Sequence, residues 1–368
     1  MIQRTLALIL TAVLFAVPLA AWIGNPSEAG RISSLDGLER YLAESIPLSG
    51  QLHDLAGDIT ILSGQSERNG LFYTEDGLME NYWPADSGEI GKRNTSSIIR
   101  FAQKGEVPTF SVIIPTAVAV KQKQAPELAP LYNQKLFIEE VSRQMSGQVT
   151  AIDVYPSLYQ RYDATGDYLY YRTDPAPTAL GGYLIYREIA ERMRFEPESL
   201  RDFDKEYPVH GYYGSLYDQW NYHKVEGDIL TVYRPREDQR GYEVTARHSD
   251  GRSAAYRTLF PLHQKDLGNP YGIYLGGDAF RVDIRVTDGA EEQENLLVFG
   301  DFTAASYLPF LLLHFGNTTL VDLSRMEEED LEEITLADYD RVLFAYSLDR
   351  YLDSEEIQKA SILLKESS

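Results

Sequence analysis

Short apolar runs recur along the chain, and such runs are typical of strands that are buried on both faces of a parallel sheet. They predict strands at 109–114 (TFSVII), 150–155 (TAIDVY), 296–299 (LLVF), 318–323 (TTLVDL) and 341–346 (RVLFAY). Helical spacing of apolar residues predicts helices over about 130–145, 178–193 and 304–315, an acidic helix around 327–333 and a helix at the C-terminus. This alternation predicts an α/β fold with a mostly parallel sheet and helices on both of its faces.

The segment from about 196 to 288 breaks the alternation. Its short runs are rich in Tyr, Thr and Val and are separated by Gly, Asp and Pro, as in ILTVYRP at 229–235 and GYEVTARHSDG at 241–251. This pattern predicts antiparallel hairpins inserted into the α/β frame. The sequence has no internal repeat and no low-complexity linker, so we expect one domain over 56–368 that includes this β-rich insert.

The N-terminus carries an uncharged run of twenty residues, Thr5 to Gly24, directly after Arg4. As a helix with a rise of about 1.5 Å per residue, it would cross the roughly 30 Å hydrocarbon core of a bilayer. The length of the run favours an uncleaved signal anchor at 1–27 over a cleavable signal peptide, the alternative reading. Both readings export the rest of the chain, so we expect an extracytoplasmic protein that is anchored to the cytoplasmic membrane or secreted after cleavage.

The anchor is followed by an expected lead-in helix at 28–55, where apolar residues recur at helical spacing (Leu35, Leu38, Leu42 and Ile46).

Composition narrows the classes of function. A net charge of −22, from 34 Lys and Arg against 56 Asp and Glu, argues against nucleic acid as a partner. The absence of cysteine excludes thiol catalysis, zinc–thiolate sites and disulfides. The acidic run at 327–333 is more typical of a solvated helix start than of a metal site. We expect no metal and no cofactor.

Two stretches carry a family likeness: YLYYRTDPAPTALGGYLIYREIAERM at 168–193 and LLVFGDFTAASYLPFLLLHFGNTTLVDLSR at 296–325. Weaker likenesses are SVIIPTAVAVKQKQAPEL after the first core strand, YYGSLY at 212–217 and YLGGDAF at 274–280. Together they resemble the DHHW family, related to the alginate O-acetyltransferases of the SGNH-hydrolase class. The resemblance covers most of residues 60–350 and implies an SGNH-hydrolase-like sheet. It also implies a Ser-His-Asp site, with the aspartate and histidine in a Thr-Asp-His-His-Trp-Thr motif and the serine after Gly/Lys-Asp.

This chain departs from the family at the positions that perform the chemistry. Asp174 matches the family aspartate, but Ala176 stands at the histidine position. Asp301 matches the residue before the serine, and Phe302 stands at the serine position. A serine hydroxyl needs a histidine to take its proton, and alanine and phenylalanine supply neither the base nor the attacking oxygen. Both losses together leave no known route to the family reaction.

A third departure lies in the GGD run at 276–278, where the family often has Gly-Gly-Asn. The asparagine amide is suited to stabilise an oxyanion, whereas the carboxylate of Asp278 would repel it. Asp174 and Asp301 could still meet at the old site and bind a cation or a sugar hydroxyl; the alternative is that each caps a turn.

A displaced nucleophile is the remaining route to activity. Thr303 is one residue along, but one step rotates a helical side chain by about 100°. Ser306 lies one helical turn later. His210, His223 and His263 lie in the insert without recognisable partner spacing, and His314 sits in an apolar run that is typical of a satisfied core histidine.

We therefore expect a non-catalytic family member. The resemblance implies that its partner is a cell-surface glycan, or a membrane-bound acyltransferase, in cell-surface polysaccharide or cell-wall modification. The rival is an active O-acyltransferase or acetyl esterase with a displaced nucleophile. A third possibility is a structural protein whose cleft is filled by Phe302.

Overall fold

The computed structural model describes residues 67–220, 224–236, 240–288 and 293–364. The expected membrane segment at 1–27 and the lead-in helix at 28–55 lie outside these residues. In the part that is described, no helix is long and apolar enough to cross a membrane. The elements below all belong to the unit formed by Glu67–Asn221 and Val225–Ser368.

An eight-stranded sheet forms the centre of this unit, in the order β5-β4-β13-β11-β12-β10-β8-β9. Its first five strands are parallel and confirm the predicted frame. They are β5 (Thr150–Ile152), β4 (Thr109–Ile114), β13 (Arg341–Ser347), β11 (Asn295–Gly300) and β12 (Asn317–Val321). The strand expected at 150–155 is shorter than predicted: it ends at Ile152, because helix α8 (Tyr155–Thr165) begins three residues later with Pro156 in its first turn.

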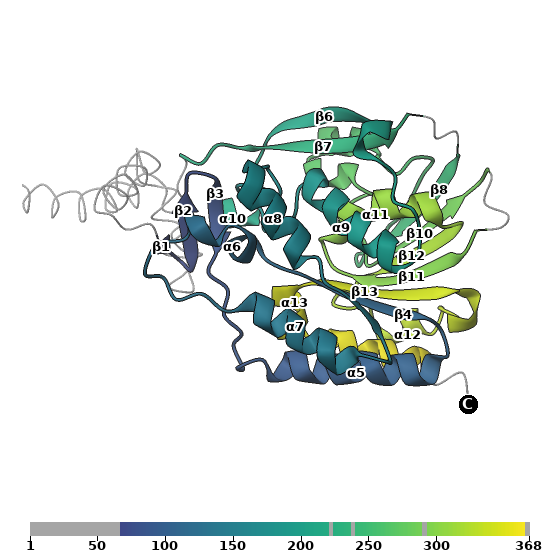
Figure 1. Cartoon of the computed structure of the whole chain (residues 1–368). Coiled ribbons are helices and arrows are strands. Elements are labelled where there is room, and N and C mark those ends of the chain that lie inside the picture. The colour runs from purple at the N-terminus through teal and green to yellow at the C-terminus, as the bar shows by residue number, and fades with distance from the viewer. Residues whose placement is uncertain (1–66, 221–223, 237–239, 289–292, 365–368) are drawn as a thin grey trace, which may run out of the picture. The chain divides into compact units, whose positions relative to one another are not determined.

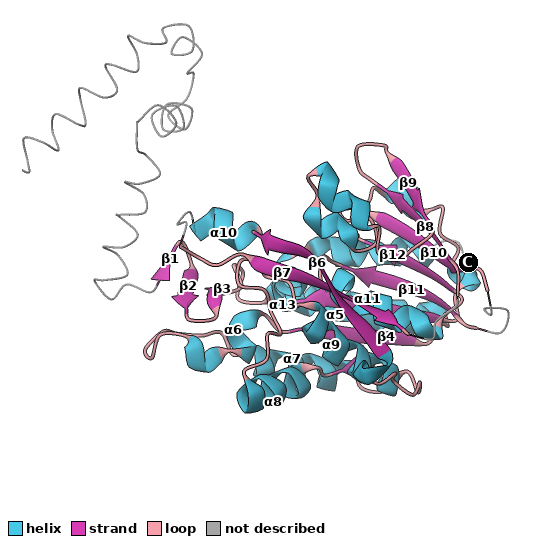
Figure 2. Cartoon of the chain, turned by 90° about the horizontal axis from the view of Figure 1, so that it is seen from above, coloured by secondary structure: helices cyan, strands magenta, loops and turns pink. Residues whose placement is uncertain are grey.

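The insert is β-rich, as predicted, and it has two parts. Its later strands are β8 (Tyr242–Arg247), β9 (Ser253–Tyr256) and β10 (Arg281–Val286). They extend the main sheet, and every pair from β12 outward is antiparallel (Figure 2). Its earlier strands, β6 (Phe203–Tyr212) and β7 (Asp228–Pro235), form a separate antiparallel pair. A third small sheet joins β1 (Glu67–Arg68), β2 (Leu71–Thr74) and β3 (Gly77–Glu80).

Helices cover both faces of the parallel strands (Figure 1). One face carries α9 (Ala179–Arg192) and α11 (Ala304–Leu311), with α8 beside α9. The other carries α5 (Glu89–Gly105), α7 (Gln134–Met145), α12 (Glu328–Leu331), α13 (Leu348–Asp353) and the 3₁₀ segment η7 (Glu355–Leu364). The short helices α6 (Ala117–Val120) and α10 (Ser215–Trp220) lie in connections.

Each central strand contributes to two hydrophobic cores. In β11, Leu296 and Val298 face the α9–α11 core, whereas Leu297 and Phe299 face the core under α5. This alternation explains why the strand is apolar at every position from Leu296 to Phe299. Helix α9 approaches α11 closely because it lacks a side chain at Gly182: a Cβ there would lie 2.0 Å from the carbonyl oxygen of Ser306.

Helix α5 is not foreseen in the sequence. Its buried face includes the polar residues Asn94 and Thr95. The Asn94 amide donates to the carbonyl oxygens of Tyr351 and Ser354, and the Thr95 hydroxyl bonds the Tyr351 hydroxyl. The Thr95 hydroxyl also donates to the carbonyl oxygen of Gly91, one turn earlier in the helix. Because Asn94 and Thr95 have these partners, the helix buries a face that does not look apolar in the sequence.

Candidate functional site

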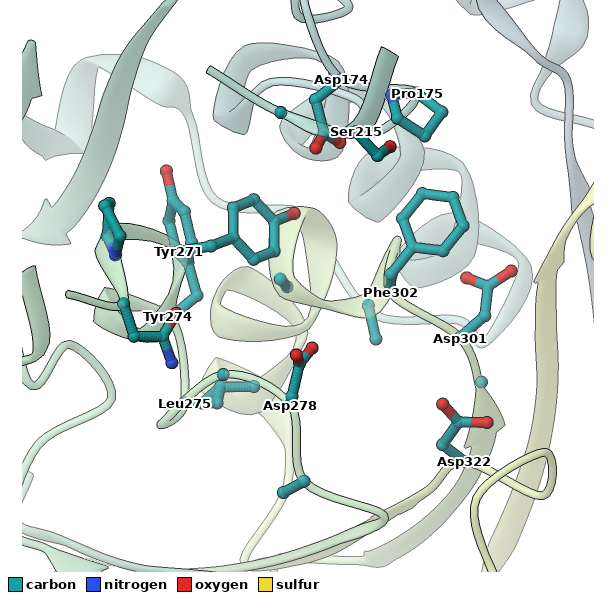
Figure 3. Close-up of a pocket in the computed structure, with 18 of the residues that line it drawn as sticks. Asp174, Pro175, Ser215, Tyr271, Tyr274, Leu275, Asp278, Asp301, Phe302 and Asp322 are labelled. Atoms are coloured by element: carbon teal, nitrogen blue, oxygen red, sulfur yellow. The ribbon is translucent and has the colours of Figure 1, made fainter. Parts of the chain in front are cut away.

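A cleft of about 490 Å³ lies at the edge of the sheet where the parallel strands end (Figure 3). Its floor comes from the residues that follow β11 and β12 and from the loop that leads into β10. That loop reaches the same edge because β10 is antiparallel to β12, with Arg281 opposite Val321. The opposite wall comes from the Asp174–Pro175 segment and from residues 212–215, before and at the start of α10. Five separate parts of the chain therefore meet here, at the edge where open α/β sheets commonly bind ligands.

Asp301 follows β11 and is held by four hydrogen bonds. Its Oδ1 accepts from the backbone N (2.9 Å) and the hydroxyl (2.5 Å) of Thr303, and its Oδ2 accepts from the backbone N (2.6 Å) and the hydroxyl (2.7 Å) of Ser347. The carboxylate thus caps its own turn and ties it to the end of neighbouring β13. Burial raises the pKa of Asp301 to about 6, although these donors act in the opposite direction.

Phe302, at the expected serine position, lines the cleft and packs in part against the α9–α11 core. Its ring faces the Asp174–Pro175 segment across the cleft in Figure 3. The cleft stays open beside it, so Phe302 does not fill the site. The two hydroxyls that were weighed as displaced nucleophiles are buried within the turn: Thr303 donates to Asp301, and Ser306 donates to the carbonyl oxygen of Thr303 at 2.7 Å.

Asp174 stands on the opposite wall and is also engaged by the protein. Its carboxylate accepts from the backbone N of Ala176 (3.0 Å), from the Tyr212 hydroxyl (3.0 Å) and from the backbone N of Ser215. Burial raises the pKa of Asp174 above its ordinary value. The wall is tight, because a Cβ on Gly214 would lie 2.3 Å from Asp174 Oδ2. Asp174 therefore caps the turn at Ala176 and the start of α10.

Ala176, at the expected histidine position, is fully buried and is not among the residues that line the cleft. Its backbone carbonyl accepts from the backbone N of Tyr171. The structure thus brings Asp174, Asp301, Phe302 and Asp278 to one cleft, whereas Ala176 lies behind the wall.

A tyrosine cluster forms one end of the cleft. The ring of Tyr271 stacks on that of Tyr212, with centroids 6.0 Å apart and planes at 28°, and meets Tyr274 edge-on at 5.3 Å. The Tyr274 hydroxyl donates to the carbonyl oxygen of Thr231. The Tyr271 hydroxyl points into the cleft and has no hydrogen-bond partner among the described residues (Figure 3). Its pKa is raised well above the ordinary value by burial and then by the neighbouring carboxylate of Asp174.

Charged side chains complete the rim. Asp278 rises from the loop before β10, and its side chain is 82% exposed. Arg325 lies between two carboxylates, 3.4 Å from Asp278 and 3.3 Å from Asp322. Asp218 and Arg350 also line the cleft.

The described histidines lie elsewhere. None of them is among the residues that line the cleft. His314 stacks between Tyr186 and Phe195, and its Nε2 is 2.9 Å from the Tyr186 hydroxyl. Burial lowers the pKa of His314 to about 4. His314 is therefore the satisfied core histidine that the sequence predicts, and His223 lies outside the described residues.

Sequence reasoning did not identify the tyrosines of the cleft or Ser215. Tyr212 and Ser215 belong to the YYGSLY run, and Tyr274 begins the YLGGDAF run, so the weaker family likenesses contained the signal. Tyr271 carried no signal, because its place beside Tyr212 depends on how the insert folds against the frame.

Comparisons with known proteins agree with this architecture. A family model described as DHHW protein matches residues 81–321. The fold is similar to that of a DHHW family protein from Eubacterium siraeum DSM 15702, with a TM-score of 0.64 and 20% identity over 80% of this chain and 95% of that chain. It is similar to Bacillus cereus PatB1 with a sulfonyl adduct, with a TM-score of 0.64 and 17% identity over 78% of this chain and 97% of that chain. No curated protein matches the sequence. The likeness confirms the SGNH-hydrolase-like α/β fold.

Proposed function

The chain belongs to the DHHW family, and on that premise we propose that it is a non-catalytic, extracytoplasmic member whose cleft binds a cell-surface glycan. The observation that carries the proposal is the cleft itself. It is open, and it holds stacked tyrosines together with the Tyr271 hydroxyl, which has no partner among the described residues, while Phe302 stands at the expected nucleophile position. Loss of a nucleophile leaves such a cleft available for binding.

The lining suits a sugar. Tyrosine rings offer flat apolar faces for the C–H surface of a pyranose, and the Tyr271 hydroxyl supplies a polar group at their edge. The carboxylates of Asp174 and Asp301 accept hydrogen bonds from the protein itself, so in this proposal they hold the two walls in place and do not bind the sugar. The N-terminal segment would hold the domain at the outer face of the membrane, where a membrane-bound acyltransferase is a second proposed partner.

The test is isothermal titration calorimetry, in which neutral oligosaccharides are titrated into the full-length chain in detergent. We expect Tyr271→Ala to weaken binding by about 1–3 kcal/mol, the value of a buried aromatic contact. Tyr207→Ala is the matched control, because Tyr207 is 52% exposed on β6 and is not among the cleft residues. Equal losses in the two variants, or no binding by the unaltered chain, would contradict the proposal.

One observation favours the rival, an active O-acyltransferase or esterase. Ser215 lines the cleft, and its backbone N donates to Asp174, so a hydroxyl does stand near a carboxylate. A sulfonyl adduct is present in the PatB1 structure, which makes a sulfonyl reagent a suitable probe here. We expect no labelling of this chain and no acetyl-ester hydrolysis above a buffer control. Labelling that Ser215→Ala removes would establish the rival.

A further inference from the structure

The charge of the cleft points to the class of glycan. Five carboxylates line it, against two guanidinium groups. Asp174 and Asp301 are occupied by donors from the protein itself. Asp322 accepts from the backbone N and the hydroxyl of Ser324 and pairs with Arg325. This leaves Asp218 and Asp278 to face a ligand, and Asp278 has an ion pair with Arg325 at 3.4 Å.

The Asp278 carboxylate and the Tyr271 hydroxyl both lie where a molecule bound in the cleft would meet them. Asp278 rises from the floor of the cleft, and the Tyr271 hydroxyl points into the same space from the end wall (Figure 3). The Tyr271 hydroxyl has no hydrogen-bond partner within the part of the chain that the structure describes, so it is available to bond a ligand from the end wall. A cleft lined mainly by carboxylates has a negative electrostatic potential, which attracts a cationic ligand.

These features select between classes of sugar. A glycan that carries carboxylates would meet the acidic rim with repulsion, which outweighs the attraction of two guanidinium groups. A neutral sugar would gain only the tyrosine contacts. A protonated amine would gain the attraction of Asp278 and Asp218, and it would also be attracted to the faces of the tyrosine rings.

We propose that the cleft selects a glycan with free amino groups, an N-deacetylated hexosamine polymer, over its N-acetylated or uronate counterparts. The inference rests on the proposed glycan-binding function and adds the substrate class. The ammonium group would lie between Asp278 and the tyrosine cluster. Asp218 would contribute at the opposite wall.

The experiment compares three oligosaccharides of equal length: glucosamine, N-acetylglucosamine and uronate oligomers. Each is titrated calorimetrically into the full-length chain at mildly acidic pH, where the amine is protonated. We expect the glucosamine oligomer to bind about three- to tenfold more tightly than the N-acetylated one, the range for one or two partly exposed ion pairs. This preference should decrease as salt is added.

Two double variants locate the effect. Asp218→Asn with Asp278→Asn removes two charges from the cleft and should abolish the preference of the glucosamine oligomer over the N-acetylated one. Asp250→Asn with Glu329→Gln removes two charges outside the cleft and should keep the preference. Both pairs are surface substitutions, and a thermal unfolding curve confirms that each variant is folded.

The outcomes separate the two proposals. Equal or tighter binding of the N-acetylated or uronate oligomer overturns this inference and leaves the glycan-binding function standing. A preference that survives the cleft variant also overturns it. Absence of binding by all three oligomers contradicts the proposed function and this inference together.

Discussion

Replacing Gly214 by alanine tests whether Asp174 is a fixed structural part of the cleft wall. The new Cβ would lie 2.3 Å from Asp174 Oδ2 and 2.4 Å from Asp174 Cβ. Contacts below 3.0 Å force one partner to move. Asp174 cannot move without breaking its bonds to the Ala176 backbone and the Tyr212 hydroxyl.

The magnitude follows from two contributions. Overpacking a buried position costs about 1–3 kcal/mol. Loss of two hydrogen bonds to a largely buried carboxylate adds about 2–4 kcal/mol, since bonds to charged groups contribute roughly 1.5–3 kcal/mol each and some are remade with water. A total of about 3–7 kcal/mol is a large part of the usual 5–15 kcal/mol of domain stability. For a domain of roughly 300 residues it lowers Tm by about 5–11 °C.

The assay is thermal and urea unfolding of Gly214→Ala, Asp174→Gly and the double variant. In the Asp174→Gly background the added methyl group meets neither the carboxylate nor the Cβ of residue 174, so its further cost should fall to about 1 kcal/mol or less. Equal costs of Gly214→Ala in both backgrounds would show that the clash with Asp174 is not the cause. Wild-type stability of the single variant would refute the geometry of the wall.

Three other predictions follow from the structure and the sequence. Because the pKa of His314 is lowered to about 4 from 6.5, His314 binds more protons in the unfolded chain between these values, so its own contribution to stability should fall as pH drops from about 6.5 to 4. The raised pKa of Asp301 acts in the opposite direction, so the measurement is the difference in urea unfolding between the unaltered chain and His314→Gln, which should change over this pH range. Restoring the family residues with Phe302→Ser and Ala176→His should give no ester hydrolysis, since the Ala176 side chain is fully buried outside the cleft; turnover above the Phe302→Ser single variant would contradict this. Alkaline phosphatase fused to the C-terminus should be active in cells, whereas an inactive fusion with full-length protein in the cytosol would refute the exported topology.

The parallel frame is predictable because its signal is local. Strands such as β11 and β13 have continuous apolar runs (LLVF and VLFAY), since both of their faces are buried. The pairing of β8 and β10 with the edge of that sheet is not local, and the insert alone does not show it. Helix α5 escapes prediction because its buried Asn94 and Thr95 look like surface residues until their partners on and after α13 are known.

The candidate site also has a part that the sequence predicts and a part that depends on the tertiary structure. Family likeness placed Asp174, Asp301, Phe302 and Asp278, and the structure gathers all four at one cleft. It could not show that Ala176 lies behind the wall, because that depends on the turn that Asp174 caps. Nor could it show the platform of Tyr212 and Tyr271, which comes from residues that are far apart in the chain.

The hydrogen bonds give structural roles to the two aspartates that match the family pattern, Asp174 and Asp301. Asp301 joins the ends of β11 and β13 through four donors, and Asp174 holds the wall at Ala176 and Ser215. Neither role requires a nucleophile or a base. Phe302 instead packs its ring partly against the α9–α11 core, so a side chain without catalytic capacity is compatible with the same turn. Retained carboxylates are thus evidence of retained architecture, and the function of this cleft has to be sought in what Tyr271 and Asp278 can bind.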